Sequence, residues 1–243
     1  MTEKILLTRP FEDSIISKKK FEKIGFEPVI IPLIEIYKLN DVKIPYKNYD
    51  LLIFTSKNAA KIFASNVASK NTIFSVGDGT FNILRKKKYK KIFNSKGNSN
   101  DLIYLFKKIF HNRKINILHP CAKNISMDLE NYFSKQGSNY EKLPVYEVKK
   151  KYPEMENFNN YFLSPNKFIT IYSSKTAETL VETIKKYRLE SFCTNKIIFA
   201  LSKKISESLK DLNFEKIYIS RSPSEQSLIN LLKITYKGKE IEK

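Results

Sequence analysis

The stretch Phe168–Val181, FITIYSSKTAETLV, decides the fold that we expect for this chain. Its first five residues are apolar, β-branched or aromatic and predict a buried strand, and the polar turn 173–176 leads into a helical pattern. A strand that enters a helix through Ser and Thr leaves unpaired N–H groups at the start of the helix, and these groups favour anions. The stretch therefore predicts one strand–helix unit of an α/β protein with an anion-binding turn.

The same pattern occurs once before, in Leu51–Phe63, LLIFTSKNAAKIF. At an offset of 118 residues the hydroxyl and lysine positions of the two turns coincide, and Phe54 meets Tyr172. Further matches at offsets of 125 and 112 residues, such as Pro32-x-x-Glu35 with Pro144-x-x-Glu147, indicate a duplicated chain. Because only one copy carries a phenol, Tyr172 is the first candidate for chemistry. The alternative is an amphipathic residue that ends a strand with a solvated tip.

Strands alternate with helices along the chain. The pattern predicts strands at residues 4–8, 28–31, 51–54, 72–76, 91–94, 114–118, 168–172, 196–201 and 216–220. It predicts helices from residue 11 to about residue 24, with Ile15, Ile16, Phe21 and Ile24 at helical spacing, and over about 80–87, 101–110, 126–135, 202–212 and 225–232. Residues 119–124 are expected to form a turn and 149–166 an irregular segment. The alternation predicts parallel sheets that helices cover on both faces, with ligands at the carboxyl ends of the strands.

The repeat order leaves two domain arrangements open. In the first arrangement, each half of the chain forms one domain. In the second, the middle of the chain forms one domain and the two ends of the chain together form the other. The alternating segments 33–38 and 143–149 occupy equivalent repeat positions and could pair as a two-stranded connection. This pairing favours the second arrangement.

Composition limits the function classes. The net charge is +19, but only five of the basic residues are arginines, and the dense cluster Arg85–Lys91 is typical of a helix end. We therefore expect no nucleic-acid partner, and a basic field would equally attract a small polyanion. No apolar run reaches the roughly 18 residues of a membrane span, and the first residues carry no signal-peptide pattern, so we expect a cytoplasmic protein without a membrane partner.

No motif predicts a metal or a coenzyme. His111 and His119 are isolated in the sequence, and Cys121 is expected to be a buried thiol rather than a nucleophile. Gly77-x-Gly79 lacks the third glycine of a dinucleotide fingerprint. The residues by themselves thus predict a two-domain α/β protein with an anion-binding cleft, little acid–base machinery and no cofactor.

Several motifs, in order along the chain, carry a resemblance to a known family. They are ILLTRP, GFEPVIIPLIEI, LLIFTSKNAA, VGDGT, QGSNYEKLPVYEV, ITIYSSKTAETLV and the closing ALSKKI and SRSPSEQSLINLL. Together they cover nearly the whole chain, and in this order and spacing the sequence resembles the uroporphyrinogen-III synthases.

The resemblance implies the second arrangement. Two similar, flavodoxin-like α/β domains with parallel sheets are joined by a two-stranded β-ladder, with a cleft between them. One domain is discontinuous, residues 1–36 plus 149–243, and the other is inserted, residues 39–145, with linker strands near 33–38 and 143–149.

The resemblance also implies a reaction. A cyclising hydro-lyase of this family closes the linear tetrapyrrole hydroxymethylbilane, inverts the terminal pyrrole through a spiro intermediate and loses water, in haem biosynthesis. It needs no cofactor and no metal. The substrate is a polycarboxylate, which suits a basic protein, and we expect a monomer that contacts hydroxymethylbilane synthase transiently.

Site residues follow from the matched motifs. Tyr172 matches the family's active-site tyrosine, which assists departure of the hydroxyl. The resemblance and the repeated turns give a set of expected substrate-binding residues: Arg9, Thr55, Ser56, Lys57, Asn58, Gly77, Thr80, Ser99, Ser173, Ser174, Ser202 and Ser224. The chain departs from the family at the turn HPCAKN, residues 119–124, and at Lys203 and Lys204, where it lacks the family's usual residues. A non-catalytic protein that binds small anions or tetrapyrroles in the same cleft is the alternative function.

Overall fold

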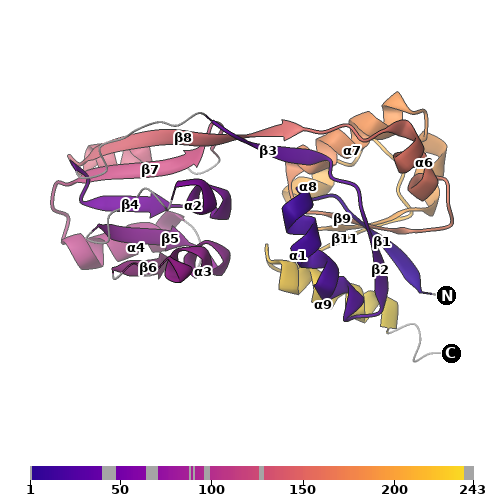
Figure 1. The fold of residues 1–243 in the computed structure, drawn as a ribbon, viewed down its shortest axis with the longest axis horizontal. Coiled ribbons are helices and arrows are strands. Elements are labelled where there is room, and N and C mark those ends of the chain that lie inside the picture. The colour runs from indigo at the N-terminus through magenta and orange to yellow at the C-terminus, as the bar shows by residue number, and fades with distance from the viewer. Residues whose placement is uncertain are drawn as a thin grey trace. The chain divides into compact units, whose positions relative to one another are not determined.

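A computed structural model describes residues 2–39, 48–63, 71–87, 89, 91–95, 99–125 and 129–237 of the chain. The structure divides into two compact units, which we call the terminal unit, Met1–Glu35 with Lys149–Lys243, and the inserted unit, Ile36–Val148. Each unit is built around its own sheet (Figure 1). The mixed α/β class with two mainly parallel sheets, which the alternation of strands and helices predicts, is confirmed.

The terminal unit contains a five-stranded parallel sheet with the strand order β11-β10-β9-β1-β2. Its strands are β1 (Glu3–Leu7), β2 (Phe26–Ile30), β9 (Phe168–Ile171), β10 (Ile197–Ala200) and β11 (Lys216–Ile219). The helices are α1 (Phe11–Glu22), α6 (Met155–Phe162), α7 (Ser174–Lys186), α8 (Lys203–Glu207) and α9 (Glu225–Lys237), and a 3-10 helix spans Glu190–Asn195. The central pair joins β1 to β9, strands that lie far apart in the sequence.

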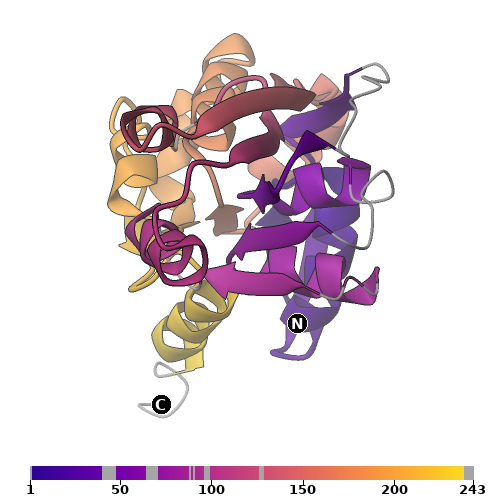
Figure 2. The same cartoon turned by 90° about the vertical axis from the view of Figure 1, so that its left-hand side faces the viewer.

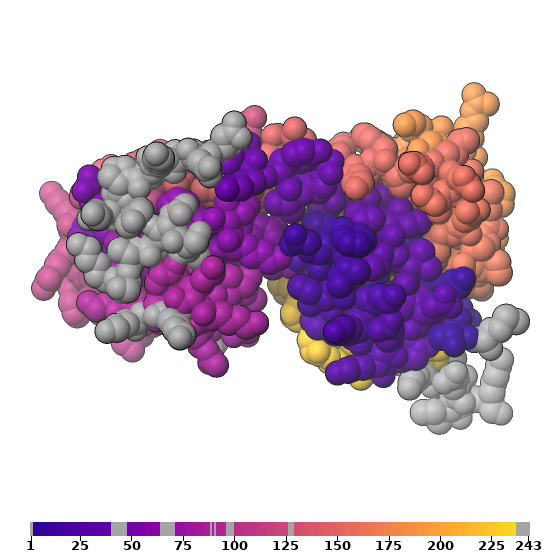
Figure 3. Space-filling model, in the orientation of Figure 1, coloured from indigo at the N-terminus to yellow at the C-terminus, as the bar shows by residue number. Residues whose placement is uncertain are grey.

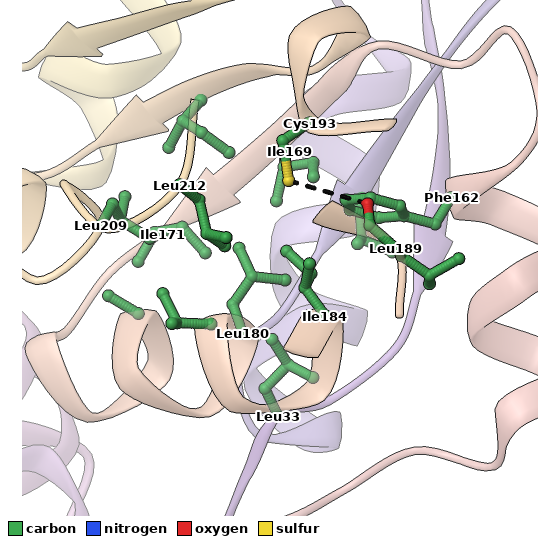
Figure 4. Packing of buried hydrophobic residues seen from close by; sticks show 14 of the residues in the cluster. Leu33, Phe162, Ile169, Ile171, Leu180, Ile184, Leu189, Cys193, Leu209 and Leu212 are labelled. Carbon is green, nitrogen blue, oxygen red and sulfur yellow. Dashed lines mark hydrogen bonds between the residues drawn. The ribbon is translucent and has the colours of Figure 1, made fainter. Parts of the chain in front are cut away.

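Alternate residues of this sheet supply two separate cores. Leu6, Ile169 and Ile198 pack against α6, α7 and α8, whereas Ile5 and Phe199 pack against α1 and α9. Figure 4 shows part of the first core, in which Leu180 and Ile184 of α7 lie among residues of the neighbouring strands and loops. Both faces of the sheet are thus apolar, which explains why its strands read as continuous hydrophobic runs.

The inserted unit follows the same plan. Its six-stranded sheet has the order β3-β8-β7-β4-β5-β6. The strands are β3 (Ile34–Lys38), β4 (Leu51–Phe54), β5 (Thr72–Val76), β6 (Ile92–Ser95), β7 (Asn116–Ala122) and β8 (Asn139–Lys150), and the helices are α2 (Lys57–Phe63), α3 (Asp78–Lys86), α4 (Ser99–Phe110) and α5 (Glu130–Lys135).

Helices cover both faces of this second sheet as well (Figure 2). Leu52 and Phe54 belong to the core that contains residues of α2 and α3, and Leu51 and Ile53 belong to the core that contains residues of α4 and α5. Successive residues of β4 therefore alternate between two apolar layers, as in a parallel sheet that is buried on both sides.

The chain passes between the two units twice, within β3 and within β8, which are neighbouring strands. Lys151 N donates to Leu33 O (2.9 Å) and Leu39 N donates to Val145 O (3.0 Å), so the two strands run antiparallel. They form the two-stranded ladder that the repeat positions of segments 33–38 and 143–149 predict.

The prediction of a turn at residues 119–124 is wrong for its first part, because β7 continues to Ala122. A proline within a central strand normally argues against the strand, since it cannot donate to the ladder. Here β4 pairs with β7 only at Ile117 and Leu118, whereas β8 pairs along β7 from Asn116 to Ala122. Pro120 thus lies beyond the stretch where ladder bonds are needed on both sides.

Two predictions about helices also need correction. Residues 149–166 are not irregular, because α6 forms there and buries Phe158 and Phe162 completely. In α1, Ile15 and Ile16 are 43% and 57% exposed, while Phe21 is buried as expected. Figure 3 shows the indigo start of the chain at the surface of the terminal unit. The start of the predicted helix at 126–128 lies outside the described residues.

The described helices of the chain include none that is long and apolar enough to cross a membrane.

The ammonium group of Lys196 is buried in the terminal unit. Lys196 is 1% exposed, and its Nζ donates to the carbonyl oxygens of Ser164 (3.0 Å) and Asn166 (2.7 Å). Burial lowers the pKa of Lys196 to about 8 from its ordinary value of 10.5. The charged form of this side chain is therefore less favourable in the folded than in the unfolded chain.

This burial predicts a pH dependence of stability. Between about pH 8 and pH 10.5 the unfolded chain holds a proton on Lys196 that the folded chain has lost, so folding becomes more favourable as the pH rises through this window. We expect the stability of the wild type relative to Lys196→Met to increase by about 1–2 kcal/mol from pH 7.5 to pH 9.5. Urea unfolding at the two pH values measures it. Lys185→Met, at a half-exposed position, is the control. If the stability difference between the wild type and Lys196→Met is the same at pH 7.5 and pH 9.5, the prediction is wrong.

Candidate active site

The parallel sheets place the predicted residues where their strands end. In the terminal unit Arg9 follows β1, Tyr172 and Ser173 follow β9, Ser202 follows β10, and Ser224 follows β11. In the inserted unit Thr55 and Ser56 follow β4, Gly77 follows β5, and Ser99 begins α4 after β6. Carboxyl ends of parallel strands meet at one edge of a sheet, which is where α/β proteins bind ligands. The structure thus gathers the predicted residues into two groups, one in each unit.

Arg9, Tyr172 and Glu225 form the central cluster of the terminal unit. The guanidinium carbon of Arg9 lies 4.3 Å from the centre of the Tyr172 ring, a cation–π contact. Arg9 Nη1 is 2.6 Å from Glu225 Oε1, and the Tyr172 hydroxyl is 3.4 Å from the same oxygen. The guanidinium and the phenol therefore donate hydrogen bonds to the same carboxylate oxygen.

Residues of α1 surround the same carboxylate. Ser17 Oγ donates to Glu225 Oε1 (2.5 Å), and Lys20 pairs with Oε2. Asp13 lies 3.6 Å from the second terminal nitrogen of Arg9. These contacts explain why Ser17 is buried on the face of α1 where an apolar residue would be expected. The cluster holds two cationic and two anionic side chains around one phenol.

The environment fixes the protonation of the two acids in the cluster. Burial raises the pKa of the Tyr172 hydroxyl above its ordinary value, and the negative charge of Glu225 raises it further. Burial acts to raise the pKa of Glu225 too, but hydrogen bonds from Lys20 and Ser17 and the charge of Arg9 outweigh it and lower that pKa. Tyr172 is thus a neutral hydrogen-bond donor, and Glu225 is an ionised acceptor.

The separation between Tyr172 and Glu225 leaves the phenol available for other partners. At 3.4 Å the hydrogen bond is long, and a bond of this length is weak. The Tyr172 side chain is also partly exposed. A ligand oxygen over the end of β9 could therefore accept the phenolic hydrogen at little cost, while Arg9 holds the ring in place.

Glu225 is absent from the residues predicted from the sequence, although the repeat contains a signal for it. At the offset of 125 residues Glu225 corresponds to Asn100, and at 112 residues Arg9 corresponds to Cys121. Tyr172 corresponds to Phe54. All three members of the cluster therefore differ in chemical type from their counterparts in the other unit, and this shared asymmetry would have pointed to them together.

The serines of the terminal unit have different roles. Ser173 is the N-cap of α7, and its Oγ accepts from the backbone N–H of Thr176 (3.1 Å). Ser224 Oγ accepts from the N–H of Ser227 (3.2 Å) at the start of α9. Ser174 is the first residue of α7, and Ser202 precedes α8 without a side-chain cap bond. Ser173 and Ser224 are thus helix caps that lie at the carboxyl edge of the sheet.

In the inserted unit a tyrosine hydroxyl and a histidine ring contact the turn after β4. Ser56 Oγ lies 2.8 Å from the Tyr146 hydroxyl and also accepts from the N–H of Asn58 (3.1 Å). Lys57 begins α2 and is partly exposed. Thr55 Oγ1 lies 2.9 Å from His119 Nε2. Thr55, Ser56, Lys57 and Asn58 therefore form one continuous polar turn.

His119, which is isolated in the sequence, has two hydroxyl partners in the structure. Its side chain is fully buried in β7, with Thr55 at one ring nitrogen and the Tyr140 hydroxyl at the other (2.5 Å). Burial, and secondly the charge of Lys142, lower the pKa of His119 to about 4. Sequence spacing could not reveal this contact, because Thr55 and Tyr140 lie on two other segments of the chain.

The remaining predicted residues lie on neighbouring turns of the inserted unit. Gly77 precedes α3 with a φ of +79°, a conformation that favours glycine, and a Cβ added there would meet no atom within 4 Å. Thr80 is 4% exposed on the inner side of α3. Cys121 is buried, as expected, and burial raises the pKa of its thiol. Within the described ranges, no three His, Cys, Asp or Glu side chains are grouped so that they could hold a metal ion.

Comparison with known proteins identifies the family. The model of the family described as "Uroporphyrinogen-III synthase HemD" matches residues 17–230. The chain belongs to the uroporphyrinogen-III synthase family. The resemblance of its motifs to this family is thereby confirmed.

A curated member of this family, "Porphyrin biosynthesis protein HemD" of Ruminiclostridium josui, is 26% identical over 252 residues. The match covers 95% of this chain and 48% of the relative, so the chain spans about half the length of that protein.

Solved uroporphyrinogen-III synthases share the fold. The enzyme of Helicobacter pylori gives a TM-score of 0.64 at 18% identity, with 96% of this chain and 98% of that chain covered. A mutant enzyme of Thermus thermophilus gives 0.58 at 15% identity, with 98% and 99% covered. At these identities the likeness establishes the two-unit α/β fold.

The cluster around Glu225 predicts an effect on stability. We expect Glu225→Gln to lower the free energy of unfolding at pH 7 by about 2 kcal/mol, because hydrogen bonds to a charged group contribute on that order. Since the folded state lowers the pKa of Glu225, its ionised form stabilises the fold above the ordinary value of 4.5, and this contribution is lost as the pH falls below it. The difference between variant and wild type should therefore shrink toward pH 3.5.

Urea unfolding at pH 7 and pH 3.5 measures this difference. Glu207→Gln, an exposed position on α8, is the matched control and should change little at either pH. A loss for Glu225→Gln that is equal at both pH values would show that the carboxylate charge does not stabilise the cluster.

Proposed function

We propose that this chain is a uroporphyrinogen-III synthase. It would close hydroxymethylbilane into uroporphyrinogen III, invert the terminal pyrrole and release one water. Membership of the family over residues 17–230 carries the proposal. The cluster of Arg9, Tyr172 and Glu225 at the carboxyl end of the terminal-unit strands supports it, because the cluster presents a phenol that keeps its proton.

Tyr172 is the proposed catalytic residue. Its raised pKa disfavours a phenolate, so we infer that it donates a hydrogen bond to the departing hydroxide and keeps its own proton. The proton that turns this hydroxide into water is the one that the substrate loses when the ring closes. Arg9 stacks on the ring and holds it in place. Before substrate binds, ionised Glu225 accepts a hydrogen bond from the phenol and takes no proton from it. The phenol then only has to turn from one acceptor to another.

The other part of the function is to hold a flexible polycarboxylate in one closing geometry, a positioning effect. We propose that the substrate is bound by residues at and near the carboxyl ends of the strands. These are Arg9, Thr55, Ser56, Lys57, Asn58, Gly77, Thr80, Ser99, Ser173, Ser174, Ser202 and Ser224. The N–H groups at the starts of the long helices α7 and α9 favour anions. The charge of +19 raises the local concentration of an acidic substrate. We also propose that the protein acts as a cytoplasmic monomer and that it meets hydroxymethylbilane synthase only transiently.

A coupled assay tests the proposal. Hydroxymethylbilane is generated in the presence of the protein by a deaminase, and the oxidised porphyrin isomers are separated. Isomer III should predominate. Isomer I alone, the spontaneous product, from a folded sample would overturn the enzyme and favour a non-catalytic tetrapyrrole-binding protein.

Tyr172→Phe separates turnover from binding. We expect kcat to fall about a hundredfold, the low end of what the loss of one hydrogen-bond donor to a developing negative charge costs, while KM changes little. Stability should also change little, because the ring still packs against Arg9. Tyr104→Phe, at a position that is 70% exposed, is the matched control. A kcat equal to that of the control would remove Tyr172 from the mechanism.

A further inference from the structure

His119 is a buried titratable group that the proposed mechanism does not use. It lies on β7 between two hydroxyls, with Nε2 2.9 Å from Thr55 Oγ1 and Nδ1 2.5 Å from the Tyr140 hydroxyl. The imidazole is 0% exposed, whereas Thr55 is partly exposed at the end of β4. A partly buried phenol is thus connected through one buried ring to a hydroxyl at the surface.

The imidazole carries a single hydrogen at neutral pH. Burial and the charge of Lys142 keep its pKa at about 4, well below physiological pH. A neutral imidazole donates from one ring nitrogen and accepts at the other. The two hydroxyls must therefore have opposite roles, and the choice between the two tautomers sets both.

The chemistry of the hydroxyls favours one tautomer. A phenol is more acidic than an aliphatic alcohol, with a pKa of about 10, and is the stronger hydrogen-bond donor. Tyr140 is also held in place, because its ring stacks on the fully buried Phe133 with centroids 5.5 Å apart. We expect Tyr140 to donate to Nδ1, so that the ring hydrogen is on Nε2 and is donated to Thr55 Oγ1.

We propose that His119 and Tyr140 are positioning residues that orient the Thr55 hydroxyl as a donor toward a carboxylate of the substrate. With Nε2–H occupying a lone pair of Thr55 Oγ1, the threonine hydrogen points to a partner outside this chain of bonds. The turn would then select ligand groups that accept hydrogen bonds and disfavour those that only donate. The identity of the substrate rests on the proposed function, but the direction of the hydrogen bonds does not.

The direction of the bonds can be measured on the free protein. Long-range proton–nitrogen NMR spectra of histidine-labelled protein distinguish the two neutral tautomers and the charged ring. The chain has only two histidines, so His111→Gln, at an exposed position, assigns the signals. We expect the Nε2–H tautomer of His119, unchanged between pH 6 and pH 8. The Nδ1–H tautomer, or a charged ring at pH 7, would overturn the proposal.

Kinetics test the role of the chain of bonds. We expect Thr55→Val, His119→Gln and Tyr140→Phe each to raise KM about tenfold with kcat within twofold, and Thr55→Ser to retain the wild-type KM. Because the three residues act in series, Tyr140→Phe combined with Thr55→Val should be no worse than Thr55→Val alone. Tyr104→Phe is the control. The positioning role is wrong if the increases in KM of the two single variants multiply in the double variant, or if kcat falls while KM is unchanged.

A binding measurement keeps this test independent of turnover. The fluorescence titration uses uroporphyrin III, the oxidised polycarboxylate product, with the same variants, and a tenfold weaker affinity for Tyr140→Phe is expected. If the wild type makes no isomer III, the proposed function fails, while the tautomer and the affinities still decide this inference. Equal affinities for the wild type and all the variants would overturn it.

Discussion

The parallel pairing of β1 with β9 is the constraint on which the terminal unit depends. Ile5, Leu6 and Leu7 pair with Phe168, Ile169 and Thr170, more than 160 residues further along the chain. Thr8 Oγ1 donates to Thr170 O (2.6 Å) and Thr170 Oγ1 donates to Leu6 O (3.0 Å), so buried side chains reinforce the ladder. Arg9 and Tyr172 follow directly, and the ladder is what brings them together.

The two units share a fold, as expected for a duplicated chain, but they carry different polar clusters. Each unit stacks helices on both faces of a mainly parallel sheet, and each has hydroxyl-bearing turns after its central strands. The polar clusters behind those turns differ. In the terminal unit they are charged and centre on Glu225, whereas in the inserted unit they centre on a neutral imidazole. The same backbone plan thus supports two different hydrogen-bonding surfaces.

Both clusters share a physical principle, because in each a side chain of fixed protonation controls the hydrogen bonds of a neighbouring hydroxyl. Ionised Glu225 leaves Tyr172 protonated in one unit, and neutral His119 orients Thr55 in the other. Neither arrangement needs a group that changes charge near neutral pH. This agrees with a proposed reaction in which the protein mainly positions the substrate and donates hydrogen bonds.

The sequence by itself determined the alternation of strands and helices, the duplication and the turns that end the strands, because hydrophobic periodicity and turn chemistry are local. It also placed Tyr172 at the end of a strand. Only the tertiary structure decided that Glu225 joins Arg9, 216 residues away, and that His119 connects Thr55 to Tyr140. Those contacts depend on which strands become neighbours and on how far each continues, and the hydrogen-bond partners of a buried polar side chain leave no periodic signal in the chain.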